Sequence, residues 1–205
     1  MIDSGGMTLS DLFFMASVLL VLVLSVSIAA LAIRRQWTTM RRVALWLAVY
    51  VGAYAVALVA TALASPRRTF AAGERRCFDD WCVAALTLDR DQSACPAAPA
   101  TEVWVATVQV SSVAKRVQQR ELGAYPELED RDGRRYSPCA EPARNLSDQV
   151  GPGEAFLVRL AFRMPAAAEP SGVLIRHSII PGIVIIGDDE SWLHPPALYA
   201  ATTRR

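Results

Sequence analysis

Two uncharged apolar runs fill most of the first third of this 205-residue chain. Residues 12–33 and residues 43–64 contain no Asp, Glu, Lys, Arg or His. A helix over either run would be about 33 Å long at 1.5 Å per residue, which is enough to cross a hydrocarbon core about 30 Å thick. So short a chain has little polar surface with which to cover two such helices in a soluble core. Both runs are therefore predicted to be transmembrane helices.

The residues before the first run differ from the start of a cleaved signal peptide. Residues 1–11 carry Asp3 and Asp11 and no Lys or Arg, whereas a signal peptide begins with a basic segment. Its apolar part is also shorter, at about 7–15 residues. We therefore expect the first run to be a retained helix that follows a short extracytoplasmic N-terminus, residues 1–11.

The segment between the two runs, residues 34–42, is strongly basic. Its cations are Arg34, Arg35, Arg41 and Arg42. Short loops rich in Arg and Lys stay on the cytoplasmic side of a membrane, so this loop is predicted to be cytoplasmic and both termini extracytoplasmic. The linker at residues 65–76 is basic too, but it precedes a long domain, and long domains cross a membrane largely regardless of charge. Ser65-Pro66 is expected to end the second helix.

Small residues recur at a spacing of four in the second run, at Ala44, Ala48 and Gly52. Such a stripe allows another helix backbone to approach closely, and the first run is the expected partner. Self-association through the stripe is the less favoured alternative. Neither run contains the ionisable groups that a transporter or proton relay places within its membrane helices, so transport is disfavoured.

After Cys77 the apolar pattern changes to an alternation with a period of two, which is typical of strands with one buried face. In residues 154–165 one set of alternate side chains is apolar throughout: Phe156, Val158, Leu160, Phe162 and Met164. Strands are predicted at residues 80–88, 102–112, 154–165, 173–179 and 183–186. Glycine-containing turns at 132–133, 151–153 and 181–182 separate them. The pattern favours an all-β, antiparallel β-sandwich over residues 77–205.

Four motifs in this half of the chain resemble a known family. They are CFDDWC at 77–82, VWVATVQV at 103–110, LEDRDGRRYSP at 128–138 and VGPGEAFLVRLAFRMP at 150–165. Together they resemble the immunoglobulin-like extracellular domain of bacterial lipoproteins and membrane-anchored proteins, the family typified by the mycobacterial immunoprotective antigen. The resemblance covers about residues 77–186. The chain departs from the family where Ser111-Ser112 replaces an Asn-centred turn, in residues 113–126, and in the tail from residue 182.

This resemblance implies an immunoglobulin-like sandwich on the outer side of a bacterial plasma (inner) membrane. The family is largely of unknown function and offers no catalytic residues to transfer to this chain. It also implies that the Asn145-Leu146-Ser147 glycosylation sequon is unused.

All four cysteines, Cys77, Cys82, Cys95 and Cys139, lie on the predicted outer side, which favours disulfides. Of the three possible pairings we favour Cys77–Cys82 with Cys95–Cys139. In an extended strand Cys77 and Cys82 would be about 16 Å apart, so the segment between them must turn. A four-thiolate zinc site is the alternative, but the spacing lacks its usual paired C-x2–4-C knuckles.

Three further groups of residues are weighed as sites. Asp130 to Gly133 resembles the start of a calcium loop, but Arg134 stands where a ligand is needed, so a hairpin turn is favoured. His177 shares an apolar face with strand residues and is expected to be partly buried. His194 lies near Asp188-Asp189-Glu190 and Ser191. These residues suit a small hydrolase or a weak cation site, but no catalytic signature supports an enzyme.

Composition excludes two classes of protein. The net charge of +1 argues against a nucleic-acid partner, and the 53% hydrophobic content argues against disorder. We therefore expect a membrane-anchored, extracytoplasmic, non-enzymatic binding module without a cofactor. Its expected partners are membrane lipid and another envelope protein, with contacts through residues 113–126 and 187–197. The alternatives are a small envelope enzyme and a ligand or ion sensor built on His194 and Asp188.

Overall fold

The computed structural model describes residues 9–78, 80–177, 184–187 and 193–204. The chain divides into two compact units. One unit comprises residues 1–66 and 180–195, and the other comprises residues 67–179 and 196–205. We call them the helical unit and the sandwich unit.

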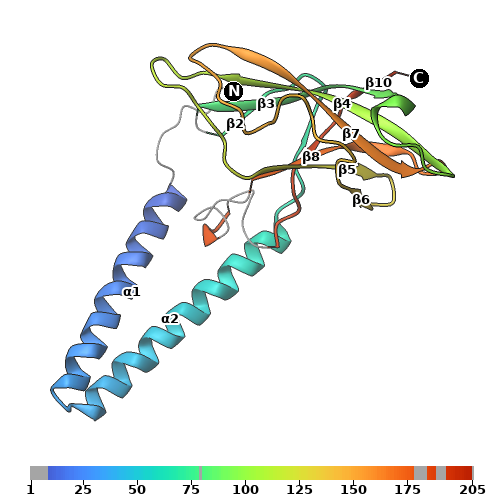
Figure 1. The fold of residues 1–205 in the computed structure, drawn as a ribbon. Helices are drawn as coiled ribbons and strands as arrows, with labels where there is room; N and C mark the ends of the chain where they lie inside the picture. The colour runs from blue at the N-terminus through green and yellow to red at the C-terminus, as the bar shows by residue number, and fades with distance from the viewer. Residues whose placement is uncertain (1–8, 79, 178–183, 188–192, 205) are drawn as a thin grey trace. The chain divides into compact units, whose positions relative to one another are not determined.

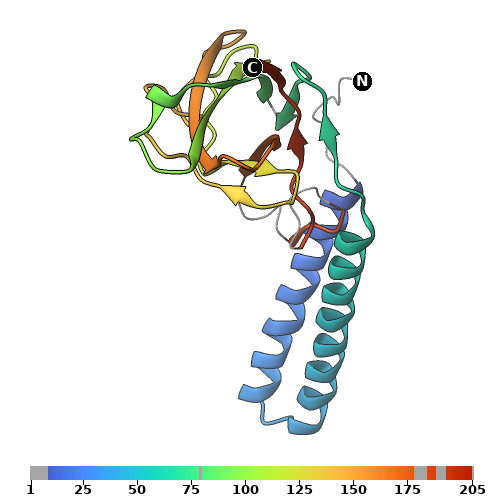
Figure 2. The same cartoon turned by 90° about the vertical axis from the view of Figure 1, so that its right-hand side faces the viewer.

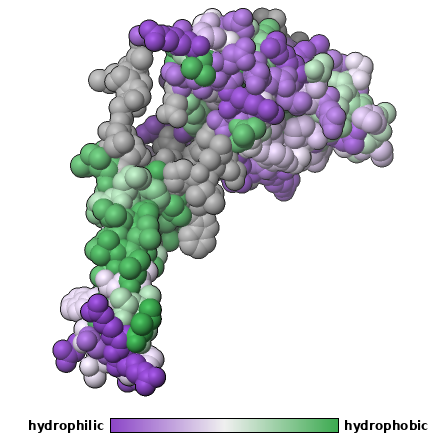
Figure 3. Space-filling view, turned by 60° about the vertical axis from the view of Figure 1, so that its left-hand side comes forward, coloured by the Kyte–Doolittle hydropathy of each residue, from purple (hydrophilic) through white to green (hydrophobic). Residues whose placement is uncertain are grey.

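The helical unit contains two long helices, α1 (Leu9–Ile33) and α2 (Trp37–Ala64), which run side by side in opposite directions (Figures 1 and 2). Both are long and apolar enough to cross a membrane. Figure 3 shows apolar side chains along the visible face of the pair and hydrophilic ones at its turn. The sequence thus located both helices, although each begins before its uncharged run.

The turn between the helices is much shorter than the predicted nine-residue loop. Only Arg34–Gln36 lie outside the helices, so Arg41 and Arg42 belong to α2. Arg35 takes a left-handed conformation with a φ of 57°. The Arg35 amide then donates to the Ala32 carbonyl and the Gln36 amide donates to that of Leu31. This pair of bonds is the Schellman helix end, and no proline or glycine after it prevents α2 from starting at once.

The helices meet through aromatic and hydroxyl side chains. The Tyr50 hydroxyl donates to Ser17 Oγ at 2.7 Å, and Ser17 Oγ donates to the Phe13 carbonyl at 2.7 Å. One turn along, the rings of Phe13 and Tyr54 stack with centroids 6.1 Å apart. Hydroxyl groups shared between helices stabilise apolar helix pairs, because they would otherwise lack partners in lipid.

The small-residue stripe does not form this interface. Ala48 and Gly52 are exposed, and no atom lies within 4 Å of where a Gly52 Cβ would be. Ala44 is only partly buried. The prediction that the stripe packs on the first helix is therefore wrong, because the Tyr50–Ser17 bond turns a different face of α2 toward α1.

The sandwich unit contains two sheets. In sheet A the strand order is β1 (Thr69–Phe70), β9 (Leu198–Tyr199), β8 (Pro170–His177), β5 (Ala124–Asp130) and β6 (Arg135–Tyr136). In sheet B the order is β10 (Thr202–Arg204), β3 (Trp81–Arg90), β4 (Thr101–Ser112) and β7 (Ala155–Pro165), and β2 (Arg76–Phe78) also pairs with β3. Figure 1 labels most of these strands.

The core lies between the two sheets and is formed by the alternating residues that the sequence indicated. The largest fully buried side chains from the two sheets include Trp104, Phe162, Leu88, Leu128, Leu160, Met164 and Tyr199. The predicted strands at 80–88, 102–112 and 154–165 correspond to β3, β4 and β7 within one or two residues. The β-sandwich class is therefore confirmed by the sheets themselves.

Four features of the fold after α2 differ from the expectation. Two edge pairs, β1–β9 and β10–β3, are parallel rather than antiparallel. The linker predicted at 65–76 already contains β1 and the start of β2, so the sandwich unit starts at Arg67. Val184–Ile186 lie in turns and bends instead of the predicted strand at 183–186, of which Ile183 lies outside the described residues. Periodicity alone cannot assign so short a continuous apolar run to a strand. Ala124–Pro126, which belong to the expected contact surface at 113–126, begin β5.

A candidate binding groove

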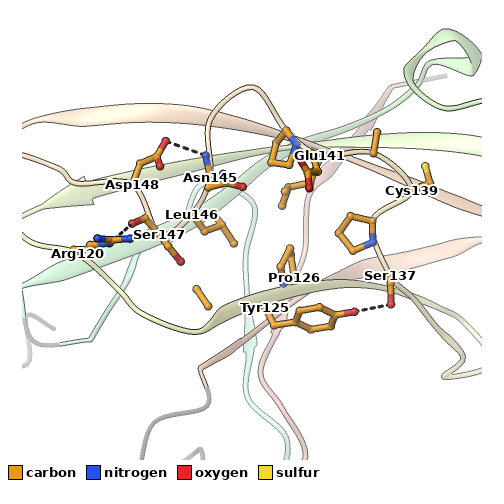
Figure 4. A pocket seen from close by; sticks show the side chains of 15 residues that line it. Arg120, Tyr125, Pro126, Ser137, Cys139, Glu141, Asn145, Leu146, Ser147 and Asp148 are labelled. Atoms are coloured by element: carbon orange, nitrogen blue, oxygen red, sulfur yellow. Dashed lines mark hydrogen bonds between the residues drawn. The ribbon is translucent and has the colours of Figure 1, made fainter.

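A groove of about 550 Å³ opens on the sandwich unit, where the chain between β6 and β7 passes beside β5 (Figure 4). Its floor is apolar, with Leu146 3% and Leu160 2% exposed. Its walls come from three segments. They are Ala124–Pro126 of β5, Ser137–Pro142, and Asn145–Asp148, with Arg120 at one end.

The wall Ser137–Pro142 is fixed to sheet B rather than to its own strand β6. Pro138 forms an isolated bridge with Phe162, and the Cys139 amide donates to the Ala161 carbonyl at 2.8 Å. Cys139 is also bonded to Cys95, with their Cα atoms 6.0 Å apart. Pro138 has no backbone N–H group, so it adds no amide donor to this wall that would need a partner. This side of the groove is therefore held by covalent and backbone bonds.

The Cys95–Cys139 disulfide also covers the outer face of sheet B. Val103, Val105 and Ala161 lie on that face and are almost fully buried beside Cys95. Ala94 and Ala140 pack against the same cluster. A second cavity of about 240 Å³ is also lined by Ala140–Pro142. This segment therefore borders both cavities and directly follows the disulfide-bonded Cys139.

The second disulfide joins neighbouring strands. Cys77 and Cys82 are opposite each other in the β2–β3 register, and their Cα atoms are 3.9 Å apart. The chain turns at Asp80, while Asp79 lies outside the described residues. These two bridges are the pairing that the sequence favoured. They account for all four cysteines and leave none free.

The rim of the groove is polar, and most of its polar groups have partners inside the chain. The Tyr125 hydroxyl donates to Ser137 Oγ at 2.7 Å and so bridges the two walls. Arg120 Nε donates to the Ser147 carbonyl at 3.0 Å. Asp148 Oδ2 accepts from the Asn145 amide at 3.0 Å (Figure 4). Opposite charges at Arg120 and Asp148 therefore stand on the rim above an apolar floor.

The Asp130 turn is a closed hairpin, and both oxygens of the Asp130 carboxylate have hydrogen-bond donors within it. Oδ1 of Asp130 accepts from the amides of Asp132 and Arg134, and Oδ2 accepts from the Tyr136 hydroxyl at 2.7 Å. Burial raises the pKa of Asp130, but these hydrogen bonds outweigh it and hold the pKa below its usual value. Burial, followed by the same bond, raises the pKa of Tyr136. The expected hairpin is thus observed.

The histidine site lies partly outside the described residues. The predicted partners of His194, namely Asp188, Asp189, Glu190 and Ser191, lie outside the described residues. Within the described chain, Nδ1 of His194 is buried without a hydrogen-bond partner. His177 pairs in register with Ala124 at the start of β5. No group of three or more His, Cys, Asp or Glu side chains suited to a metal occurs in the described ranges.

Sequence reasoning missed the groove but named two of its segments for other reasons. Residues 113–126 were expected to be a contact surface, and Arg120 and Ala124–Pro126 line the groove. Cys139, which lines the opposite wall, was considered in the sequence only as a disulfide partner. Val113, Val117 and Leu122 in the same stretch are exposed. The signal that could have located the far wall is the pair of prolines at 138 and 142 after a strand.

Comparison with known proteins gives two structural neighbours and no family. No protein-family model matches the chain, and no curated protein matches it. The secreted protein MPT63 from Mycobacterium tuberculosis is 16% identical, with a TM-score of 0.44, over 56% of this chain and 93% of its own. An uncharacterized β-sandwich protein from Clostridium difficile 630 is 13% identical, with a TM-score of 0.37, over 57% of this chain and 90% of its own. The fold assignment rests on the sheets described above.

Proposed function

We propose that this chain is a membrane-anchored, extracytoplasmic binding module without enzymatic activity. The observation that carries the proposal is the exposure of large apolar side chains along both helices, such as Leu19 at 64%, Val26 at 62% and Trp46 at 71%. Water would penalise these surfaces, whereas lipid tails would not. The arginines of the turn then orient the pair with the turn in the cytoplasm.

The outer location of the sandwich is supported by its chemistry. Two disulfides are stable in an oxidising compartment and rare in the cytoplasm. Ser65-Pro66 follows α2 directly, and the sandwich unit begins at the next residue, Arg67. An immunoglobulin-like sandwich on the outer face of a bacterial plasma membrane agrees with the arginine rule and with the disulfides.

The groove is the proposed binding site, and its chemistry suits an extended segment of another envelope protein. A volume of about 550 Å³ is within the usual range for ligand sites. The floor of Leu146 and Leu160 would take apolar side chains. The charges of Arg120 and Asp148 at the rim would orient the segment.

Labelling of single introduced cysteines tests the anchoring and the topology. Gln36→Cys lies in the turn and Leu157→Cys lies on the sandwich, and both positions are exposed. In spheroplasts an impermeant maleimide is expected to label Leu157→Cys at once and Gln36→Cys only after permeabilisation. The reverse order, or labelling of both before permeabilisation, would refute the proposed topology.

Site-specific photocrosslinking tests the groove. A benzophenone amino acid replaces Tyr125 in the wall, which is 46% exposed, and, as a control, Leu157, which is 55% exposed. We expect a discrete crosslinked product from position 125 alone, and its loss when Ser147→Trp fills the groove. Identical products from both positions, or a product that survives Ser147→Trp, would contradict groove binding.

A further inference from the structure

The segment between β8 and β9 contributes a turn to the helical unit rather than to the sandwich. Its described residues Val184–Gly187 belong to the same compact unit as α1 and α2. The Tyr54 hydroxyl donates to the Val184 carbonyl at 2.7 Å. Val184, Ile185 and Ile186 are uncharged and apolar, with Val184 37% exposed and Ile185 buried.

The hydrogen bond fixes the level of this turn along the helices. Tyr54 stacks on Phe13, so Val184, Tyr54 and Phe13 share one level. Phe13 is 20 residues before Ile33, which corresponds to about 30 Å along a helix. This length equals the thickness of the hydrocarbon core, about 30 Å. Measured along α1, with Ile33 at the cytoplasmic boundary, the shared level therefore coincides with the outer boundary.

Aromatic residues at this level agree with such a boundary. Tyrosine is enriched where hydrocarbon meets headgroups, because its ring is apolar and its hydroxyl needs a polar partner. Tyr50 and Tyr54 both donate to groups within the helical unit. A backbone carbonyl without a hydrogen bond has a high free energy in hydrocarbon. The Val184 carbonyl avoids this penalty because it accepts a hydrogen bond from the Tyr54 hydroxyl.

The end of α2 extends past this level by about 15 Å, since Ala64 is ten residues after Tyr54. The Ser17–Tyr50 and Phe13–Tyr54 contacts set an antiparallel register that places Leu9, the first residue of α1, opposite Leu58. The residues of α2 that the described structure buries are Leu58 and Ala62, at or beyond that point. Among the last turns of α2, the described structure therefore covers Leu58 and Ala62, whereas Val56 and Leu63 each remain 69% exposed.

We infer that the turn Val184–Gly187 is a third membrane-contacting element, which lies in the outer-leaflet interface and places Val184 against lipid. The inference rests on the proposed membrane anchoring. Lipid is favoured as the occupant over a second protein because the turn is uncharged and stands at a boundary level set by the helices themselves. The sandwich would then be tied to the membrane by this loop as well as by α2.

Depth-dependent quenching tests the inference on the full chain in phosphatidylcholine nanodiscs that hold one copy each. Single cysteines at Val184, Val23 and Leu157 are labelled with the dye NBD under non-reducing conditions, so that both disulfides persist. Val23 is exposed near the middle of α1, and Leu157 is exposed on the sandwich. Quenchers are nitroxides at acyl carbon 5 or carbon 12, and aqueous iodide.

The dye at Val184→Cys is expected to be quenched at least twofold more by the carbon-5 nitroxide than by the carbon-12 nitroxide. The dye at Val23→Cys should show the opposite order, and the dye at Leu157→Cys should respond to iodide alone. Iodide-only quenching at Val184→Cys, or an order like that of Val23→Cys, overturns the inference. Iodide-only quenching at Val23→Cys would instead refute the anchoring itself.

Discussion

Arg67, three residues after the end of α2, forms a two-pronged ion pair with the buried carboxylate of Glu129. Nη1 contacts Oε1, Nη2 donates to Oε2 at 3.0 Å, and Nε donates to the Pro196 carbonyl at 2.9 Å. Glu129 is 5% exposed, and Arg135 Nε lies 3.5 Å from the same carboxylate. The first residue of the sandwich unit thus joins β5 to the irregular segment that leads into β9.

Removing this arginine should destabilise the protein strongly. Arg67→Ala leaves the buried Glu129 carboxylate with one cation, and such losses cost about 3 kcal/mol. Arg67→Lys should have a smaller effect, because lysine keeps the positive charge but cannot bond both Glu129 oxygens at once as the guanidinium does. The measurement is thermal unfolding of the full chain in detergent. The control is Arg131→Ala, which breaks the exposed pair with Glu169 and should cost under about 1 kcal/mol. Equal losses at positions 67 and 131 would contradict the buried-pair interpretation.

The pKa of Asp130 predicts a loss of stability in acid. Because its folded pKa is below the usual value near 3.9, the unfolded chain binds the proton first as the pH falls. The stabilisation is complete at neutral pH and declines from about pH 5 downward, through the folded pKa. The melting temperature of Asp130→Asn should therefore fall less between pH 6 and pH 3 than that of the wild type. The control, Asp132→Asn at an exposed position, should show the same fall in melting temperature as the wild type. The same fall in Asp130→Asn would contradict the lowered pKa of Asp130.

The two disulfides should differ in their contribution to stability. The Cys95–Cys139 bridge spans 44 residues and the Cys77–Cys82 bridge spans 5. Loop-closure entropy assigns them about 4 and about 2 kcal/mol, respectively. Cys95→Ser with Cys139→Ser should therefore lower the melting temperature more than Cys77→Ser with Cys82→Ser. It should also raise amide hydrogen exchange at Val103 and Val105, which the bridge covers; unchanged exchange there would contradict this role.

The helix contact predicts opposite outcomes for two small residues. Ser17→Leu should weaken the hairpin, because Ser17 is 5% exposed and holds the Tyr50 hydroxyl. Gly52→Leu should leave the hairpin intact, because the space at Gly52 is open. Thermal unfolding in detergent distinguishes the two variants. A greater loss with Gly52→Leu than with Ser17→Leu would restore the small-residue stripe as the interface.

His194→Ala discriminates between the binding module and the alternative built on His194 and Asp188. The binding module predicts that the crosslinked product at position 125 persists with the same yield, because His194 is not among the residues that line the groove. The yield of the crosslinked product is measured in His194→Ala and in the wild type, with Ser147→Trp as the negative control. Loss of the product in His194→Ala at an unchanged melting temperature would favour the alternative.

The sequence by itself determined the two helices, the long strands β3, β4 and β7, and the Asp130 hairpin. Each depends on local pattern: uncharged length for a helix, period two for a strand with one buried face, and Asp-x-Asp-Gly for a turn. The favoured disulfide pairing was likewise inferred from the position of four cysteines. These features need no information about which distant segments meet.

Only the tertiary structure decided the rest. The face of α2 that packs on α1 depends on where Tyr50 finds Ser17, 33 residues away. The groove is formed by Ser137–Pro142 only because Pro138 and Cys139 pair with β7 instead of continuing β6. Strands as short as β1 and β9 have no period of their own, and exist because each completes the hydrogen bonds of the other at the edge of sheet A. Contacts between segments far apart in the chain leave no local periodic pattern in the residues that make them.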